Sequence, residues 1–144
     1  MTTQPPPFGQ TLAFAERTLT AALTRRLAER DTRPETWYAL QLVAGRGPGL
    51  AREALVADLE GSRTMTADST RELLARLEAE GLIRGDAEVD LTPEGAALHR
   101  SLREYVAVAT RRLLGQFDAR DVETTIRTLQ AITARAEEEL AAER

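Results

Sequence analysis

Glu72-Leu-Leu-Ala-Arg-Leu-Glu-Ala-Glu-Gly-Leu-Ile83 predicts the end of an amphipathic helix that starts near residue 66. Leucines spaced three and four residues apart form its apolar side, and Gly81 is typical of a left-handed C-cap. Residues 83–91 follow directly; they are short, contain Gly85-Asp86 and alternate roughly between polar and apolar side chains. This pattern predicts a small β-hairpin with its tip near Gly85-Asp86 or Asp86-Ala87.

Leu91-Thr-Pro-Glu-Gly-Ala-Ala-Leu98 predicts the start of the next helix, because Thr92 is a hydroxyl N-cap and Pro93 fits the first turn. Upstream of the quoted segments, apolar residues predict a helix over residues 50–59, followed by a turn at Gly61-Ser62. The order helix, turn, helix, hairpin is that of a winged helix-turn-helix unit.

The flanking helices carry more apolar surface than one winged unit can cover. They are predicted over residues 11–30, from Pro93 to Gly115, and from Asp118 to the end of the chain; another helix starts at Pro34. The surplus suggests association with a second copy, for which a C₂ homodimer is the commonest solution. The residues expected at this dimer interface are Leu12, Leu19, Leu23, Val122, Ile126 and Leu129.

The predicted fold class is therefore mainly α with a small β-hairpin wing, in which a winged helix-turn-helix core is flanked by N- and C-terminal dimerisation helices. Its parts are a proline-containing disordered lead-in (1–10), an N-terminal dimerisation helix (11–33), a winged helix-turn-helix DNA-binding unit (34–92) and C-terminal dimerisation helices (93–144).

The two quoted segments resemble the end of the recognition helix and the entry to the long dimerisation helix in MarR-type regulators. Pro34-Glu-Thr-Trp-Tyr-Ala-Leu40 fits the family's second helix only weakly. The resemblance covers roughly residues 10 to 140. It implies a homodimer that binds double-stranded, pseudo-palindromic operator DNA as a repressor or activator, and that releases this DNA when a small, often aromatic, ligand binds.

The resemblance also implies recognition-helix positions at Thr66, Asp68, Ser69, Thr70, Arg71 and Glu72. The residues expected to bind DNA are Arg63, Thr64, Thr66, Ser69, Thr70, Arg71, Arg76 and Arg84. Arg71 is the best candidate for a base edge, since arginine reads guanine, although a solvated helix arginine is about as common. Arg76 is equally suited to an ion pair with Glu72 or Glu80.

Charge argues against simple DNA binding. Residues 50–92 hold five arginines and ten acidic residues, net −5, whereas residues 1–49 carry +2 and residues 93–144 carry −1. All 19 cations are arginines. Because cations that displace counterions supply most non-specific DNA affinity, the arginines of residues 50–84 must gather on one face for binding.

Two further features depart from the family. Its wing tip typically carries an Asp-x-Arg motif, whereas this hairpin has no arginine at its tip and Arg84 only at its base. The connection between residues 59 and 66 is also longer than a compact turn, so either the third helix extends or the recognition helix is tilted differently. These departures leave an alternative open: a MarR-fold protein with weakened or lost DNA binding that senses a ligand or binds a protein partner through its acidic middle domain.

Other chemistry has little support. The chain has no cysteine and one histidine, His99, which argues against a metal site, and it offers no catalytic set or cofactor loop. We therefore expect neither an enzyme nor a bound cofactor. With 29% charged residues, no long apolar run and no leader-like start, we expect a cytoplasmic protein without a membrane span. Candidate ligand-binding residues are Phe14, Trp37 and Tyr38, although Trp37 shares a stripe with Leu40 and fits the core as well.

Overall fold

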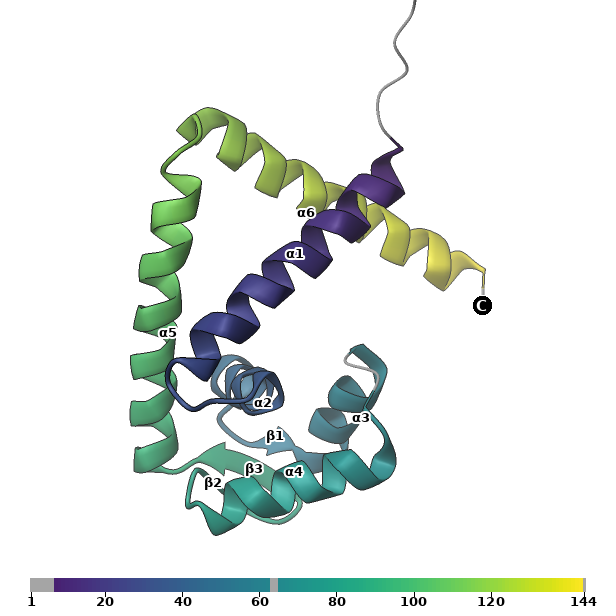
Figure 1. The fold of residues 1–144 in the computed structure, drawn as a ribbon. Coiled ribbons are helices and arrows are strands. Elements are labelled where there is room, and N and C mark those ends of the chain that lie inside the picture. Colours follow the sequence, from purple (N-terminus) through teal and green to yellow (C-terminus); the bar gives the residue numbers. More distant parts are fainter. Residues whose placement is uncertain (1–6, 63–64, 144) are drawn as a thin grey trace, which may run out of the picture. The chain divides into compact units, whose positions relative to one another are not determined.

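The computed structural model describes residues 7–62 and 65–143, without the side chain of Ser62. The described residues contain six helices and three short strands (Figure 1). In chain order they are α1 (Phe8–Ala28), α2 (Pro34–Arg46), β1 (Leu50–Ala51), α3 (Arg52–Ser62), α4 (Ala67–Ala79), β2 (Ile83–Arg84), β3 (Glu88–Leu91), α5 (Pro93–Leu114) and α6 (Ala119–Ala142). The chain forms two compact units, Met1–Val106 and Ala107–Arg144, so that α5 contributes to both.

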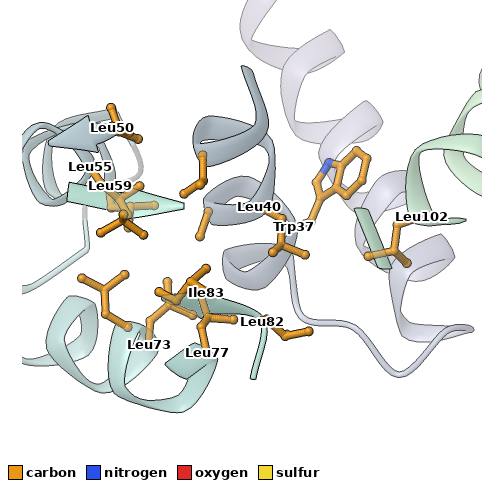
Figure 2. Packing of buried hydrophobic residues seen from close by; sticks show 14 of the residues in the cluster. Trp37, Leu40, Leu50, Leu55, Leu59, Leu73, Leu77, Leu82, Ile83 and Leu102 are labelled. Carbon is orange, nitrogen blue, oxygen red and sulfur yellow. The ribbon is translucent and has the colours of Figure 1, made fainter. Parts of the chain in front are cut away.

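The first unit contains a winged helix-turn-helix core. Helices α2, α3 and α4 contact one another, and β3 contacts α2 (Figure 1). Their apolar faces meet in one aliphatic cluster, to which Trp37 of α2 and Leu102 of α5 also belong (Figure 2). The largest side chains with less than 2% exposure are Leu27, Leu40, Leu55, Leu59, Leu73, Leu77 and Leu102. This confirms the predicted fold class.

Several predicted local signals are present. Gly81 has a φ of +73°, the left-handed conformation expected after α4. Pro34 lies in the first turn of α2. The Thr92 hydroxyl accepts a hydrogen bond from the Gly95 N–H at 2.9 Å, which caps α5, and the Asp118 carboxylate caps α6 by accepting from the Arg120 N–H at 2.8 Å. The hairpin joins β2 to β3 through residues 85–87, as predicted.

The start of the third helix differs from the prediction. Leu50, expected on that helix, lies in β1 and pairs with Val89 of β3, so the wing is a three-stranded antiparallel sheet in the order β1-β3-β2. Gly49 has a φ of +72° and its N–H donates to Asp90 Oδ1 at 2.7 Å, which turns the chain alongside β3. Helical periodicity could not show this, since two residues are too few to display a strand pattern.

Two helix bounds also shift. Helix α3 extends to Ser62, which is the first of the two alternatives for the long connection to α4. Helix α1 begins at Phe8, inside the predicted lead-in of residues 1–10, and its first turn closes with a hydrogen bond from Thr11 N–H to Pro7 O at 3.0 Å. The first six lead-in residues lie outside the described residues. Among the described residues, no helix has the length and apolar character that crossing a membrane requires.

Candidate nucleic-acid interface

Helix α4 has one buried and one exposed face. Thr70, Leu73, Leu74 and Leu77 are buried against the core. The exposed positions are Ala67, Asp68, Arg71, Glu72, Ala75, Glu78 and Ala79. The sequence folds this way because its leucines recur at helical spacing on the buried side only. The face that a DNA duplex would meet thus carries three acidic residues and one arginine.

The hydroxyl groups at the start of α4 serve the helix itself. Thr66 and Ser69 form a reciprocal capping box, in which Ser69 N–H donates to Thr66 Oγ1 at 3.1 Å and Thr66 N–H donates to Ser69 Oγ at 3.0 Å. Such a box fixes the N-terminus of the helix. Thr66 is exposed and Ser69 half-buried.

Thr70 requires a correction. We expected this residue to bind DNA, but its side chain is 0% exposed and its hydroxyl donates to Thr66 O at 2.9 Å. The prediction failed because a threonine inside a helix can satisfy its hydroxyl on the carbonyl four residues earlier and then pack in the core. In this conformation the Thr70 hydroxyl is occupied by a hydrogen bond within the helix.

The two arginines of α4 point to different sides of the helix. Arg71 is exposed, and its Nη2 lies 3.4 Å from Asp68 Oδ1 in an i,i+3 ion pair. Arg76 is half-buried, and its Nη2 donates to Thr36 Oγ1 of α2 at 3.5 Å. Five residues correspond to a rotation of about 140° around the helix axis. The two guanidinium groups therefore belong to different surfaces, and only Arg71 lies on the outer face.

The remaining predicted DNA contacts lie elsewhere. Arg84 is exposed on β2, where its cross-strand neighbour is Asp90 of β3. Arg63 and Thr64 lie outside the described residues. Arg71 and Arg76 thus lie on different sides of α4, Arg84 lies on β2, and each has an acidic residue or an α2 contact nearby.

One functional candidate escaped sequence reasoning. Arg52, the first residue of α3, contacts the turn of the wing, residues 85–87: its Nε donates to Asp86 O at 2.6 Å and its Nη2 donates to Gly85 O at 2.8 Å. The same Nη2 forms an ion pair with Glu78 of α4 at 2.5 Å. The only sequence signal at Arg52 is its charge. Its position beside the wing follows from strand β1, which the sequence did not predict.

A groove runs between α3 and α4 on the outer side of this unit. It has a volume of about 430 Å³ and an apolar floor that includes Val56 and Leu74. Both Arg52 and Arg71 line it, opposite Glu60 and Glu78. The groove is therefore the place where two of the described arginines approach the outer surface together, although its charges balance.

Solved structures share the arrangement of α2, α3, α4 and the wing. Neither a protein-family model nor a curated protein sequence matches this chain. Among solved structures, the DNA complex of the Mycobacterium tuberculosis MarR family protein Rv2887 gives a TM-score of 0.73 with 22% identity, covering 89% of this chain and 98% of that chain. This chain has the MarR fold.

Two further structures support the MarR fold. Rv2887 in complex with p-aminosalicylic acid gives a TM-score of 0.75 with 21% identity, covering 89% of this chain and 99% of that chain. A mutant of MarR from E. coli gives a TM-score of 0.75 with 16% identity, covering 91% of this chain and 99% of that chain. Nearly the whole length of each structure is matched, so the likeness includes the helices outside the winged unit.

The three predicted ligand residues occupy different environments in this MarR fold. Trp37 is 4% exposed in the core, and Tyr38 is half-buried and packs against the same core. Phe14 is 58% exposed on α1, with the Arg17 guanidinium carbon 4.7 Å from its ring centroid. A ligand site that uses all three residues stays a prediction.

His99 of α5 lies against Trp37, with ring centroids 5.8 Å apart in a stacked arrangement. Its Nε2 lies 3.4 Å from Gln41 Oε1 of α2. Burial, and then the positive charge of Arg103, lower the pKa of His99 below its ordinary value. In the described part of the chain, no group of three His, Asp or Glu side chains could hold a metal ion.

This lowered pKa predicts that acid destabilises the protein. Because the folded state resists protonation of His99, the stabilisation is complete above the unfolded pKa of about 6.5 and is lost as the pH falls through the folded pKa. Urea unfolding between about pH 7 and pH 5 should show a decreasing free energy of unfolding, and His99→Phe, which keeps an aromatic ring against Trp37, should flatten this decrease. An equally steep decrease in the variant would contradict the assignment.

The predicted dimer residues lie at the surface of their own units. On α1, Leu12 and Leu19 are 42% and 53% exposed, whereas Leu23 packs partly against the core. On α6, Ile126 is 47% exposed and Val122 and Leu129 are half-buried. Solvent exposure of large aliphatic side chains at helical spacing is typical of a helix that meets a partner.

Proposed function

We propose that this protein is a DNA-binding transcriptional regulator that acts as a homodimer on a pseudo-palindromic operator. The observation that carries the proposal is the outer face of α4: a capped helix, packed on α3 through its leucines, that exposes Thr66 and Arg71 within the MarR fold. A helix presented in this way fits the major groove, where arginine distinguishes guanine from the other bases.

The proposal includes a response to a small ligand. Rv2887, which shares the fold, has been solved both with DNA and with p-aminosalicylic acid. We extend this to the present chain as a proposal, in which Phe14, Trp37 and Tyr38 are the candidate ligand contacts. The protein would work in the cytoplasm and would have no enzymatic activity.

A titration with the DNA upstream of the protein's own gene tests this function. Measured at low and moderate salt, binding should prefer this DNA over a scrambled sequence of the same length, and the affinity should fall as the salt concentration rises. The same titration with added salicylate tests the ligand response. Absence of any sequence preference at both salt concentrations would exclude the DNA-binding proposal.

Arg71 should contribute most to operator recognition among the described residues of α4. We expect Arg71→Ala to weaken operator binding about ten-fold and to relax discrimination at one base pair, because a bidentate arginine–guanine contact is lost. Arg135→Ala is the matched control, since Arg135 on α6 is equally exposed and also forms an i,i+3 ion pair, with Glu138. Equal operator affinities for the two variants would remove Arg71 from the interface.

A second candidate function has its own support. The exposed face of α4 bears Asp68, Glu72 and Glu78, and Arg71 lies beside Asp68. Such a face would repel a phosphate backbone. We therefore keep the alternative that the protein has weakened or lost DNA binding and senses a small ligand or binds a protein partner through its acidic middle domain. The titration separates the two functions, because lost DNA binding predicts no sequence preference and weakened DNA binding predicts a preference seen only at low salt.

A further inference from the structure

Arg52 joins three elements of the winged unit through one guanidinium group. Its Nε and Nη2 donate to the carbonyl oxygens of Asp86 and Gly85, at 2.6 and 2.8 Å, and Nη2 also pairs with Glu78 Oε1 on α4 at 2.5 Å. The Arg52 backbone N–H donates to Ala87 O at 2.9 Å. A single residue at the start of α3 therefore binds the carbonyl groups of all three residues in the wing turn.

The wing turn has few other means of keeping its position. Residues 85–87 are exposed and lie between β2 and β3, of which β2 has only two residues. Gly85 has a φ of +110°, and a Cβ on it would lie 1.9 Å from Glu88 O, so this turn requires glycine at residue 85. The strands that flank the turn are short, and β1, which pairs with the other edge of β3, also has only two residues. The contacts from Arg52 tie the turn to α3 and α4.

The charge of Arg52 is already balanced. Its side chain is 27% exposed, and Glu78 supplies a carboxylate within ion-pair distance. The Nε and Nη2 groups of Arg52 already donate to two wing carbonyls and to this carboxylate. The geometry therefore suits a positional role better than a direct contact with DNA.

We propose that Arg52 is a positioning residue for DNA binding: it holds the wing turn at a fixed place relative to α4, so that both meet the duplex together. The proposal rests on the proposed DNA-binding function. The turn of the wing, Gly85-Asp86-Ala87, contains no cation of its own. An arginine outside the hairpin would therefore hold this turn in place.

Two substitutions separate position from charge. Arg52→Lys keeps the positive charge but lacks the planar fork that serves several acceptors at once, whereas Arg52→Gln lacks both. If Arg52 acts by position, both variants should bind the operator about ten-fold more weakly, with an unchanged slope of log affinity against log salt. Arg46→Lys is the matched control, because Arg46 forms its ion pair with Asp58, between α2 and α3.

A second measurement needs no DNA. The NMR order parameters of the Asp86 and Ala87 amides should be about 0.85 in the unmodified protein, which indicates a rigid turn. They should fall toward about 0.6 in Arg52→Lys and Arg52→Gln. In Arg46→Lys they should not change. Thermal unfolding of each variant establishes that it is folded before these comparisons are made.

The outcomes are distinct. Recovery of operator affinity by lysine, or a salt slope lower by about one in Arg52→Gln, would show that Arg52 acts by charge and would overturn the proposal. Unchanged order parameters in both variants would overturn it as well. If the unmodified protein binds no operator, the proposed function fails, whereas the order parameters still decide whether Arg52 holds the wing.

Discussion

Replacing Gly95 by alanine is expected to lower the free energy of unfolding by about 3 kcal/mol, because a methyl group cannot enter the space beside this residue. An added Cβ would lie 1.9 Å from Leu82 O and 2.9 Å from Leu82 C. Both atoms belong to the backbone, so no change of side-chain rotamer can relieve the overlap. The first turn of α5 would have to move away from the segment between α4 and β2.

That movement would break hydrogen bonds on both sides of the contact. Leu82 O accepts from Thr92 N–H at 3.0 Å, and Leu82 N–H donates to Leu77 O at 2.9 Å. On the helix side, the Gly95 N–H donates to the Thr92 hydroxyl, which itself donates to Gly81 O. The end of α4 and the start of α5 are thus joined through a contact that only glycine permits.

Gly45→Ala provides the matched control. Gly45 also lies in a helix, α2, but an added Cβ there would have no neighbour within 4 Å. This variant should be neutral or more stable by up to about 1 kcal/mol, because alanine has the higher helix propensity. Urea unfolding of both variants gives the comparison, and equal midpoints for Gly95→Ala and the unmodified protein would contradict the close packing.

The same contact explains why part of the fold could be predicted from the sequence. Leu91-Thr-Pro-Glu-Gly95 combines a cap, a helix-starting proline and a glycine at a backbone crossing, and each is a local signal with a local structural consequence. Gly81 works in the same way at the end of α4. Signals of this kind predict where helices begin and end. The order of the helices and the hairpin then predicts the winged unit.

The parts that could not be predicted depend on contacts between distant residues. Strand β1 forms because Leu50 pairs with Val89, which lies 39 residues later in the sequence. The local pattern of apolar residues instead predicts that Leu50 begins a helix. Arg52 acquires its contacts with Gly85 and Asp86 only through that strand. The choice between surface and core at Thr70 was also invisible, since a threonine suits both and tertiary packing decides.

Ile126→Glu is expected to convert the protein to a monomer and to weaken operator binding at least about one hundred-fold, because two half-sites are then no longer bound together. Helix α6 spans 24 residues, Ala119–Ala142, and buries none of them within the described single chain. Its large apolar side chains nevertheless recur at helical spacing, and Ile126, Ile132 and Leu140 are 47%, 42% and 60% exposed. An exposed apolar stripe of this length is typical of a helix that packs against a partner.

Ala131→Glu adds the same charge about 140° around α6 from Ile126 and about 100° from Ile132, on the side away from the stripe, and should leave the dimer intact. Sedimentation at micromolar concentration measures the oligomeric state of the unmodified protein and of both variants, and the operator titration measures the functional cost. A charge placed inside the interface must be desolvated without a partner, whereas the same charge on the far side stays hydrated. If the unmodified protein sediments as a monomer, or if Ile126→Glu remains a dimer, α6 does not form the interface. Loss of operator affinity in Ile126→Glu with an intact dimer would instead place this face of α6 in another role.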